Sequence, residues 1–146
     1  MEVLSKTTET TKELACRIAL DLEENTVLAL HGDLGSGKTT FTRYLVDALG
    51  INARVQSPTF ILHRHYSSED KTKLINTVHH LDLYRLTQPS ELEELDFVEL
   101  FNTPNSIVVI EWPDIAHNVL PQNTMHIYFE YIDENTRKIT YDENTN

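Results

Sequence analysis

The stretch that decides the fold reads TVLALHGDLGSGKTTFTRYLVDALG and covers residues 26–50. It opens with an uninterrupted β-rich run, which is typical of a strand buried on both faces. Its second half repeats apolar residues at helical spacing and ends at Gly50, a residue suited to terminate a helix. The sequence therefore predicts a buried strand, a glycine-rich turn and a helix in direct succession.

The turn between them has the spacing G-x-x-x-x-G-K-[ST], from Gly32 to Thr39. Glycines allow successive backbone N–H groups to point at phosphate oxygens, and the helix dipole adds positive potential. The alternative is an ordinary glycine-rich turn that contains a lysine by chance. The strand before the turn and the helix after it argue against that alternative. We expect the loop to bind a nucleoside triphosphate with Mg²⁺ through Gly35, Ser36, Gly37, Lys38, Thr39 and Thr40.

The remaining chain alternates helical and strand patterns without a repeat or a linker. We expect helices over about 10–24 and from residue 90, and strands over about 55–62, 74–84, 107–110, 125–131 and 137–141. Strands interspersed with helices indicate an α/β class. The sequence predicts a P-loop NTPase-like three-layer fold with a mainly parallel central sheet and a C-terminal β-hairpin, formed by a single domain over residues 1–146.

Composition excludes some classes of function. The 146 residues carry 23 acidic and 12 basic side chains, a formal net charge of -11, which argues against direct tight binding to nucleic acid. An acidic surface could bind a basic protein partner, or it could simply keep the protein soluble. The lone Cys16 lies in an apolar context, which predicts a buried thiol and a reducing compartment. The chain lacks a membrane-length apolar run and begins with a polar segment, so we expect a soluble cytoplasmic protein.

Catalysis on a triphosphate also requires a carboxylate for Mg²⁺ and a group that orients the attacking water. Glu111 directly follows a hydrophobic strand, where ligand sites of α/β proteins form, whereas Asp82 is the more usual residue type for this role. The residues leave this choice open. Thr59 follows a proline between the loop's helix and the next expected strand, a position typical of segments that sense the γ-phosphate.

Tryptophan and histidine are two further side-chain types that could serve the site. Trp112 is the only tryptophan, and beside Glu111 it is suited either to pack on a ring or partner surface or to fill the core. The seven histidines show no metal-ligand spacing, and the adjacent His79 and His80 point to opposite faces of a strand.

Four motifs occur together in one order: GDLGSGKTTF at 32–41, SPTF at 57–60, HLDLYRL at 80–86 and EWP at 111–113. In these motifs the chain resembles the TsaE family, formerly YjeE, over about residues 8–140. Those proteins are small bacterial ATPases needed to make N6-threonylcarbamoyladenosine at position 37 of tRNAs that read codons starting with A. One departure is Asp96, where the family usually has glycine; if the backbone there has positive φ, we expect a local cost without loss of function.

The resemblance implies roles for individual residues. It implies catalytic roles for Lys38, Thr59, Asp82 and Glu111, with Mg²⁺ bound by Thr39 and a carboxylate of Asp82 or Glu111. Trp112 would lie beside the site, Thr8 would lie against the adenine, and Arg137 of the final hairpin would approach the nucleotide. The implied cofactors are ATP and Mg²⁺. The implied partners are TsaB and TsaD, and hydrolysis would reset their complex between cycles.

Two other functions remain as alternatives. A small-molecule kinase would use the same phosphate loop, but such enzymes usually close an arginine-rich lid and this chain has no arginine cluster. A nucleotide-gated binding module would use ATP to order the Thr59 segment, with incidental hydrolysis. Because the sequence shows no obvious arginine finger, we expect slow hydrolysis by the chain alone.

Overall fold

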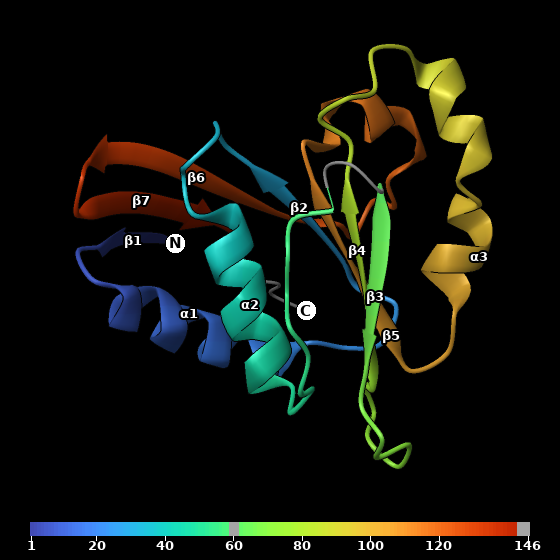
Figure 1. The fold of residues 1–146 in the computed structure, drawn as a ribbon, viewed down its shortest axis with the longest axis horizontal. Coiled ribbons are helices and arrows are strands. Elements are labelled where there is room, and N and C mark those ends of the chain that lie inside the picture. The colour runs from blue at the N-terminus through green and yellow to red at the C-terminus, as the bar shows by residue number, and fades with distance from the viewer. Residues whose placement is uncertain (59–61, 143–146) are drawn as a thin grey trace.

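The computed structural model describes residues 1–58 and 62–142 and contains one mixed sheet with helices on both faces (Figure 1). The strands are β1 (Glu2–Ser5), β2 (Val27–His31), β3 (His63–Ser67), β4 (Thr77–Asp82), β5 (Ser106–Glu111), β6 (Met125–Asp133) and β7 (Thr136–Tyr141). The α-helices are α1 (Thr8–Asp21), α2 (Lys38–Ala48) and α3 (Phe97–Asn102), with 3₁₀ segments η1 (Pro89–Glu94) and η2 (Pro113–Val119).

The sheet has the strand order β1-β7-β6-β2-β5-β4-β3. Its centre is parallel, because β2 pairs with both β5 and β6 and β5 also pairs with β4 in parallel. Both edges are antiparallel, through β3 on one side and β7 and β1 on the other. This arrangement confirms the α/β fold with a mainly parallel centre and a C-terminal hairpin.

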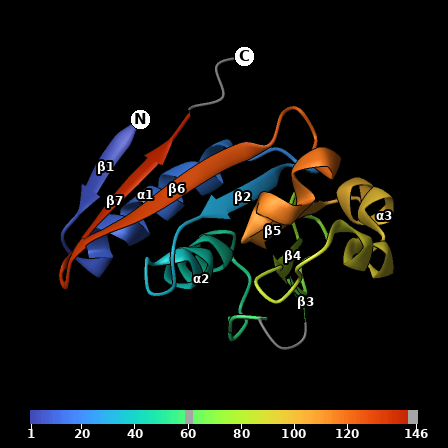
Figure 2. The same ribbon diagram turned by 90° about the horizontal axis from the view of Figure 1, so that it is seen from above.

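Side chains of the central strands point alternately to the two faces of the sheet, and they form one hydrophobic cluster on each face. In β2, Leu28 and Leu30 pack with α1 and α2, whereas Val27 packs on the opposite face with α3 and η2. The two views show α1 and α2 together against one side of the sheet, with α3 over its β4–β5 end (Figures 1 and 2). The parallel strands are therefore buried on both faces, as their continuous apolar sequences predict.

Several expected boundaries are wrong. The first helix begins at Thr8 and not near residue 10, because Thr7 caps it by accepting from the Thr10 amide, and it ends at Asp21. A strand is expected over 55–62, but the described residues of that range do not form one. Residues 51–58 have no regular structure, and β3 begins at His63. Strand β1 was not predicted at all.

Two expectations about single residues are also corrected. Cys16 is exposed, because α1 turns its apolar face at Leu14, Ala15 and Ile18 toward the sheet and leaves position 16 outside. Asp96 does not occupy a left-handed position. Its φ is -84°, and its side chain caps α3 by accepting from the Glu99 amide, which accounts for aspartate there.

No helix within the described ranges 1–58 and 62–142 combines the length and apolar content needed to cross a membrane.

His79 makes stability sensitive to acid. Burial, reinforced by the neighbouring His63 and His65, lowers the pKa of His79 from 6.5 to about 4. The unfolded chain therefore binds more protons than the folded chain between these values, so this contribution to stability is complete above pH 6.5 and is lost as pH falls toward 4. We expect His79→Gln to reduce the acid-induced loss of unfolding free energy by about 1–2 kcal/mol, measured by urea denaturation at neutral pH and near pH 4.

The matched control for this change is His117→Gln, since His117 is exposed on η2. It should retain the acid sensitivity of the unmodified chain. Equal acid sensitivity in the His79 and His117 variants would show that another group carries the effect.

Candidate nucleotide-binding site

The loop between β2 and α2 has a backbone that glycine makes possible. Gly35 and Gly37 have φ of 77° and 106°, in the left-handed region, and Gly37 is the residue that precedes the first turn of α2. At Gly32, a Cβ atom would lie 2.6 Å from both the Phe129 carbonyl oxygen and Ser36 Oγ. The loop is therefore folded against β6 and opens on the N-terminus of α2, as a phosphate-binding loop requires.

Ser36 offers an unused hydrogen-bonding group inside this loop. Its side chain is 1% exposed, and its hydroxyl has no hydrogen-bond partner among residues 1–58 and 62–142. Buried hydroxyls are normally paired because an unmade hydrogen bond is costly. The orphaned Ser36 hydroxyl and the glycine backbone are the features of this loop that suit a bound phosphate.

Lys38 begins α2 and is almost completely buried. Its ammonium group donates to the Gly32 carbonyl oxygen and lies 3.6 Å from the centre of the Trp112 ring. Burial lowers the pKa of Lys38, and the nearby carboxylates, Glu111 first, partly oppose that shift. Trp112 thus contacts the key cation of the loop, although it is not among the residues that line the adjoining cavity.

Thr39 and Glu111 meet beside this lysine. The Thr39 hydroxyl donates to Glu111 Oε1 at 3.1 Å, and Glu111 itself is 2% exposed at the end of β5. A hydroxyl and a carboxylate side by side at a phosphate loop are oxygen ligands of the kind that Mg²⁺ uses. No cluster of three His, Cys, Asp or Glu within the described ranges is arranged to hold a metal ion.

Asp82 ends β4 directly beside Glu111, since these two residues are register partners in adjacent parallel strands. It is also 2% exposed. Its carboxylate accepts from the Ser57 hydroxyl at 3.1 Å and from the Tyr84 amide at 2.9 Å. The structure therefore brings both candidate carboxylates to one edge of the sheet and pairs the Thr39 hydroxyl with Glu111.

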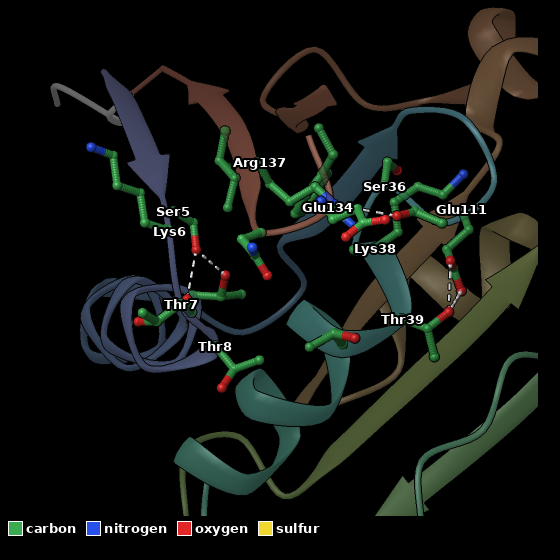
Figure 3. Close-up of a pocket in the computed structure, with 17 residues that line it drawn as sticks. Ser5, Lys6, Thr7, Thr8, Ser36, Lys38, Thr39, Glu111, Glu134 and Arg137 are labelled. Atoms are coloured by element: carbon green, nitrogen blue, oxygen red, sulfur yellow. Dashed lines mark hydrogen bonds between the residues drawn. The ribbon is translucent and has the colours of Figure 1, made fainter. Parts of the chain in front are cut away.

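A cavity of about 370 Å³ adjoins the loop. The close-up shows Lys38, Thr39 and Glu111 at one end and Lys6, Thr7 and Thr8 at the other (Figure 3). Its lining includes the expected residues Gly35, Ser36, Gly37, Lys38, Thr39, Thr40, Thr8, Arg137 and Glu111. Arg137 donates to the Gly35 carbonyl oxygen at 3.3 Å and lies over the Tyr131 ring. Thr59 lies outside the described residues.

Sequence reasoning missed one wall of this cavity. Lining residues that it did not single out are Ser5, Lys6, Thr7, Thr11, Phe129, Glu134, Asn135 and Ile139. The first four lie on and after the unpredicted β1, where the Ser5 hydroxyl bonds to Thr11 Oγ1 at 2.7 Å. The polar lead-in before α1 was the available signal, because it leaves side chains free to face a ligand.

A family model described as "Threonylcarbamoyl adenosine biosynthesis protein TsaE" matches residues 5–139, nearly the whole chain. The chain belongs to the TsaE family. The family match includes the loop, both carboxylates and the Arg137 hairpin.

Individual TsaE proteins resemble the chain over most of its length. A tRNA threonylcarbamoyladenosine biosynthesis protein TsaE from Rickettsia felis is 38% identical over 130 residues, covering 88% of this chain and 72% of the relative. The Bacillus subtilis protein of that name is 34% identical over 133 residues, covering 91% and 79%. The crystal structure of Bacillus subtilis YdiB superposes with a TM-score of 0.78 at 28% identity, covering 97% of this chain and 83% of that one.

Proposed function

We propose that this TsaE protein binds ATP with Mg²⁺ and hydrolyses it slowly, to support formation of N6-threonylcarbamoyladenosine at position 37 of tRNAs that read codons starting with A. The observation that carries the proposal is the pairing of Thr39 with the buried Glu111 directly beside Lys38. A phosphate loop without a carboxylate could bind nucleotide, whereas this arrangement also has the group that metal-dependent hydrolysis needs.

Each group in the loop has a separate task. The backbone N–H groups at Gly35–Gly37 and the Ser36 hydroxyl bind phosphate oxygens, and Lys38 leaves the Gly32 carbonyl to contact the β- and γ-phosphates. Thr39 and Glu111 would hold the metal, and Asp82, the register partner of Glu111, would share that role or orient water. When bound, Mg²⁺ would supply positive charge that offsets the negative charge developing in the transition state.

The other end of the cavity suits the nucleoside. Thr8 opens α1 there, and Arg137 lines the same cavity from β7. In this proposal the threonine-rich wall contacts the adenine and the arginine approaches the phosphates or ribose. These contacts would place ATP along the cavity with its γ-phosphate toward Glu111.

The role in tRNA modification follows from the family, and we propose in addition that the protein acts together with partner proteins. The formal net charge of -11 disfavours direct tight binding to tRNA, so the protein would act through the TsaB–TsaD complex in the cytoplasm. An acidic protein that reaches tRNA chemistry through other proteins needs no basic groove of its own.

ATP turnover by the purified chain should be slow and should rise when TsaB and TsaD are added together. The expected increase is at least about tenfold, because a missing stabilising group supplied in trans can raise phosphoryl transfer strongly. Phosphate release would be measured for the chain alone, for TsaB–TsaD alone and for the mixture. Unchanged turnover in the mixture would contradict partner stimulation, and rapid phosphorylation of a metabolite would favour a kinase instead.

A further inference from the structure

We propose that His80 is a positioning residue for Glu111, and that Tyr66 ties this pair to the backbone of Gln56, the segment that leads to Thr59. The inference rests on the proposed function, because Glu111 matters as a metal-binding carboxylate only if the chain uses Mg²⁺ with a nucleotide. It names a role for two side chains outside the phosphate loop.

The contact between His80 and Glu111 is short and fully buried. His80 is 0% exposed, and its Nε2 lies 2.6 Å from Glu111 Oε2. An ionised carboxylate can only accept hydrogen bonds, so His80 Nε2 must carry the proton and donate it. A charge-assisted hydrogen bond inside the protein fixes the orientation of the carboxylate more firmly than solvent would.

Glu111 is thereby held from two sides. His80 donates to Oε2, and the Thr39 hydroxyl donates to Oε1 at 3.1 Å. The first donor comes from β4 and the second from α2. The carboxylate plane is thus set before any metal arrives. Partners that orient a ligand in this way typically change metal affinity by about 10- to 100-fold when they are removed.

Tyr66 connects this pair to a third element. Its hydroxyl accepts from the Gln56 amide at 3.3 Å, and its single proton faces two acceptors, the Gln56 carbonyl oxygen at 3.1 Å and His80 Nδ1 at 3.2 Å. Tyr66 is 6% exposed on β3. A continuous path of hydrogen bonds therefore runs from the Gln56 backbone through Tyr66 and His80 to Glu111.

The next residue holds the second carboxylate. The Ser57 hydroxyl donates to Asp82 Oδ2 at 3.1 Å. The segment 56–57 is thus connected to both carboxylates. Ser57 bonds directly to Asp82, and Gln56 is linked to Glu111 through Tyr66 and His80. A displacement of this short segment would shift Asp82 and Glu111 together, which would couple the segment that precedes Thr59 to metal binding.

The neighbouring histidine shows that a partly buried contact on β4 need not involve the site. His79, one residue earlier and on the opposite face, bonds to His63 on β3 at 3.0 Å. That pair contacts neither carboxylate in the described structure. The position of His80 on the α2 face, two residues before the register partner of Glu111, is what gives it the proposed role.

The test compares His80→Leu, His80→Gln and Tyr66→Phe. Glutamine keeps an N–H donor at the reach of His80 Nε2, leucine removes it, and phenylalanine deletes only the hydroxyl. The readout is the Mg²⁺ concentration that half-saturates the protein–ATP complex, followed by Trp112 fluorescence, together with ATP affinity in EDTA. His80→Leu should raise that Mg²⁺ concentration about 10- to 100-fold while leaving metal-free ATP affinity within about twofold.

The other variants separate positioning from loss of structure. His80→Gln should restore most of the Mg²⁺ affinity, and Tyr66→Phe should raise the half-saturating concentration several-fold while remaining folded. Tyr141→Phe is the matched control, because Tyr141 is similarly buried but bonds to Arg17 and Met1. It should leave the Mg²⁺ response unchanged.

Each result has one meaning. If Tyr66→Phe and the folded His80 variants keep the Mg²⁺ response of the unmodified chain, the positioning role is overturned, and a lowered melting temperature alone would not support it. If His80→Leu does not fold, the Tyr66→Phe result decides. The unmodified chain tests the proposed function separately: ATP turnover without any Mg²⁺ dependence would contradict that function, whatever the variants do.

Discussion

Replacing Lys38 by methionine should reduce ATP turnover by about 10²- to 10³-fold, the usual effect of removing one fixed group that stabilises transition-state charge. Methionine keeps an apolar stem of similar length against Trp112 and removes only the cation that would contact the β- and γ-phosphates. Single-turnover assays at saturating ATP would measure the loss in the chemical step, and nucleotide titration would measure the loss in affinity.

Lys12→Met is the control for this change, since Lys12 is exposed on α1 and away from the cavity lining. It should retain full turnover. If Lys38→Met also kept turnover within about twofold, the loop would not act on the triphosphate in the proposed way. Thermal denaturation would check the fold, because methionine removes both the donor to the Gly32 carbonyl oxygen and the positive charge beside Glu111.

Glu111→Gln should also reduce turnover by about 10²- to 10³-fold, but with a different signature. Glutamine has nearly the same shape and its one amide oxygen can accept from either Thr39 or His80, but it removes the negative charge expected to hold Mg²⁺. We therefore expect metal-free nucleotide affinity to be kept and Mg²⁺ dependence to be lost. The measurements are nucleotide affinity with and without Mg²⁺, phosphate release, and reconstituted tRNA modification with TsaB and TsaD.

This variant also discriminates between hydrolysis and gating. If tRNA modification continued over many cycles while phosphate release was abolished, the chain would be a nucleotide-gated module and hydrolysis would be incidental. Glu130→Gln provides the control, because Glu130 is an exposed carboxylate on β6. Its turnover and its Mg²⁺ dependence should both match the unmodified chain.

The parts of the fold that the sequence predicted are those encoded by local patterns. The strand before the loop, the loop itself and α2 follow from a continuous apolar run, fixed glycine spacing and helical periodicity within 25 consecutive positions, 26–50. Strand β5 was equally clear, since all its residues are buried. In each case the decisive information lies within one element.

Elements that depend on distant partners were missed. Strand β1 is short and exposes Glu2 and Leu4, so it shows no strong alternation. It exists because it pairs with β7, whose residues lie at 136–141. Conversely, residues 55–58 begin the segment predicted as a strand but form none, since Val55 joins the hydrophobic cluster on the α1–α2 face and none of the described strands pairs with them.

The site shows the same division. The loop motif alone predicted Lys38 and Thr39. Which of Asp82 and Glu111 lies nearer to Thr39 depends instead on how the strands are ordered in the sheet. Only the pairing of β4 with β5 shows that the two acids are neighbours, and only the packing of α2 shows that Thr39 bonds to Glu111. His80 was quoted as part of a motif, but its contact with Glu111 required that same pairing.

The position of β1 has a consequence for how the protein is made. The residues of β1 are synthesised well before their sheet partners in β7, Arg137–Thr140. The wall of the cavity formed by Ser5, Lys6 and Thr7 therefore cannot close before β7 has been synthesised, and contacts between such distant segments form slowly. The phosphate loop also packs against Phe129 of β6, so both ends of the cavity are completed late in synthesis.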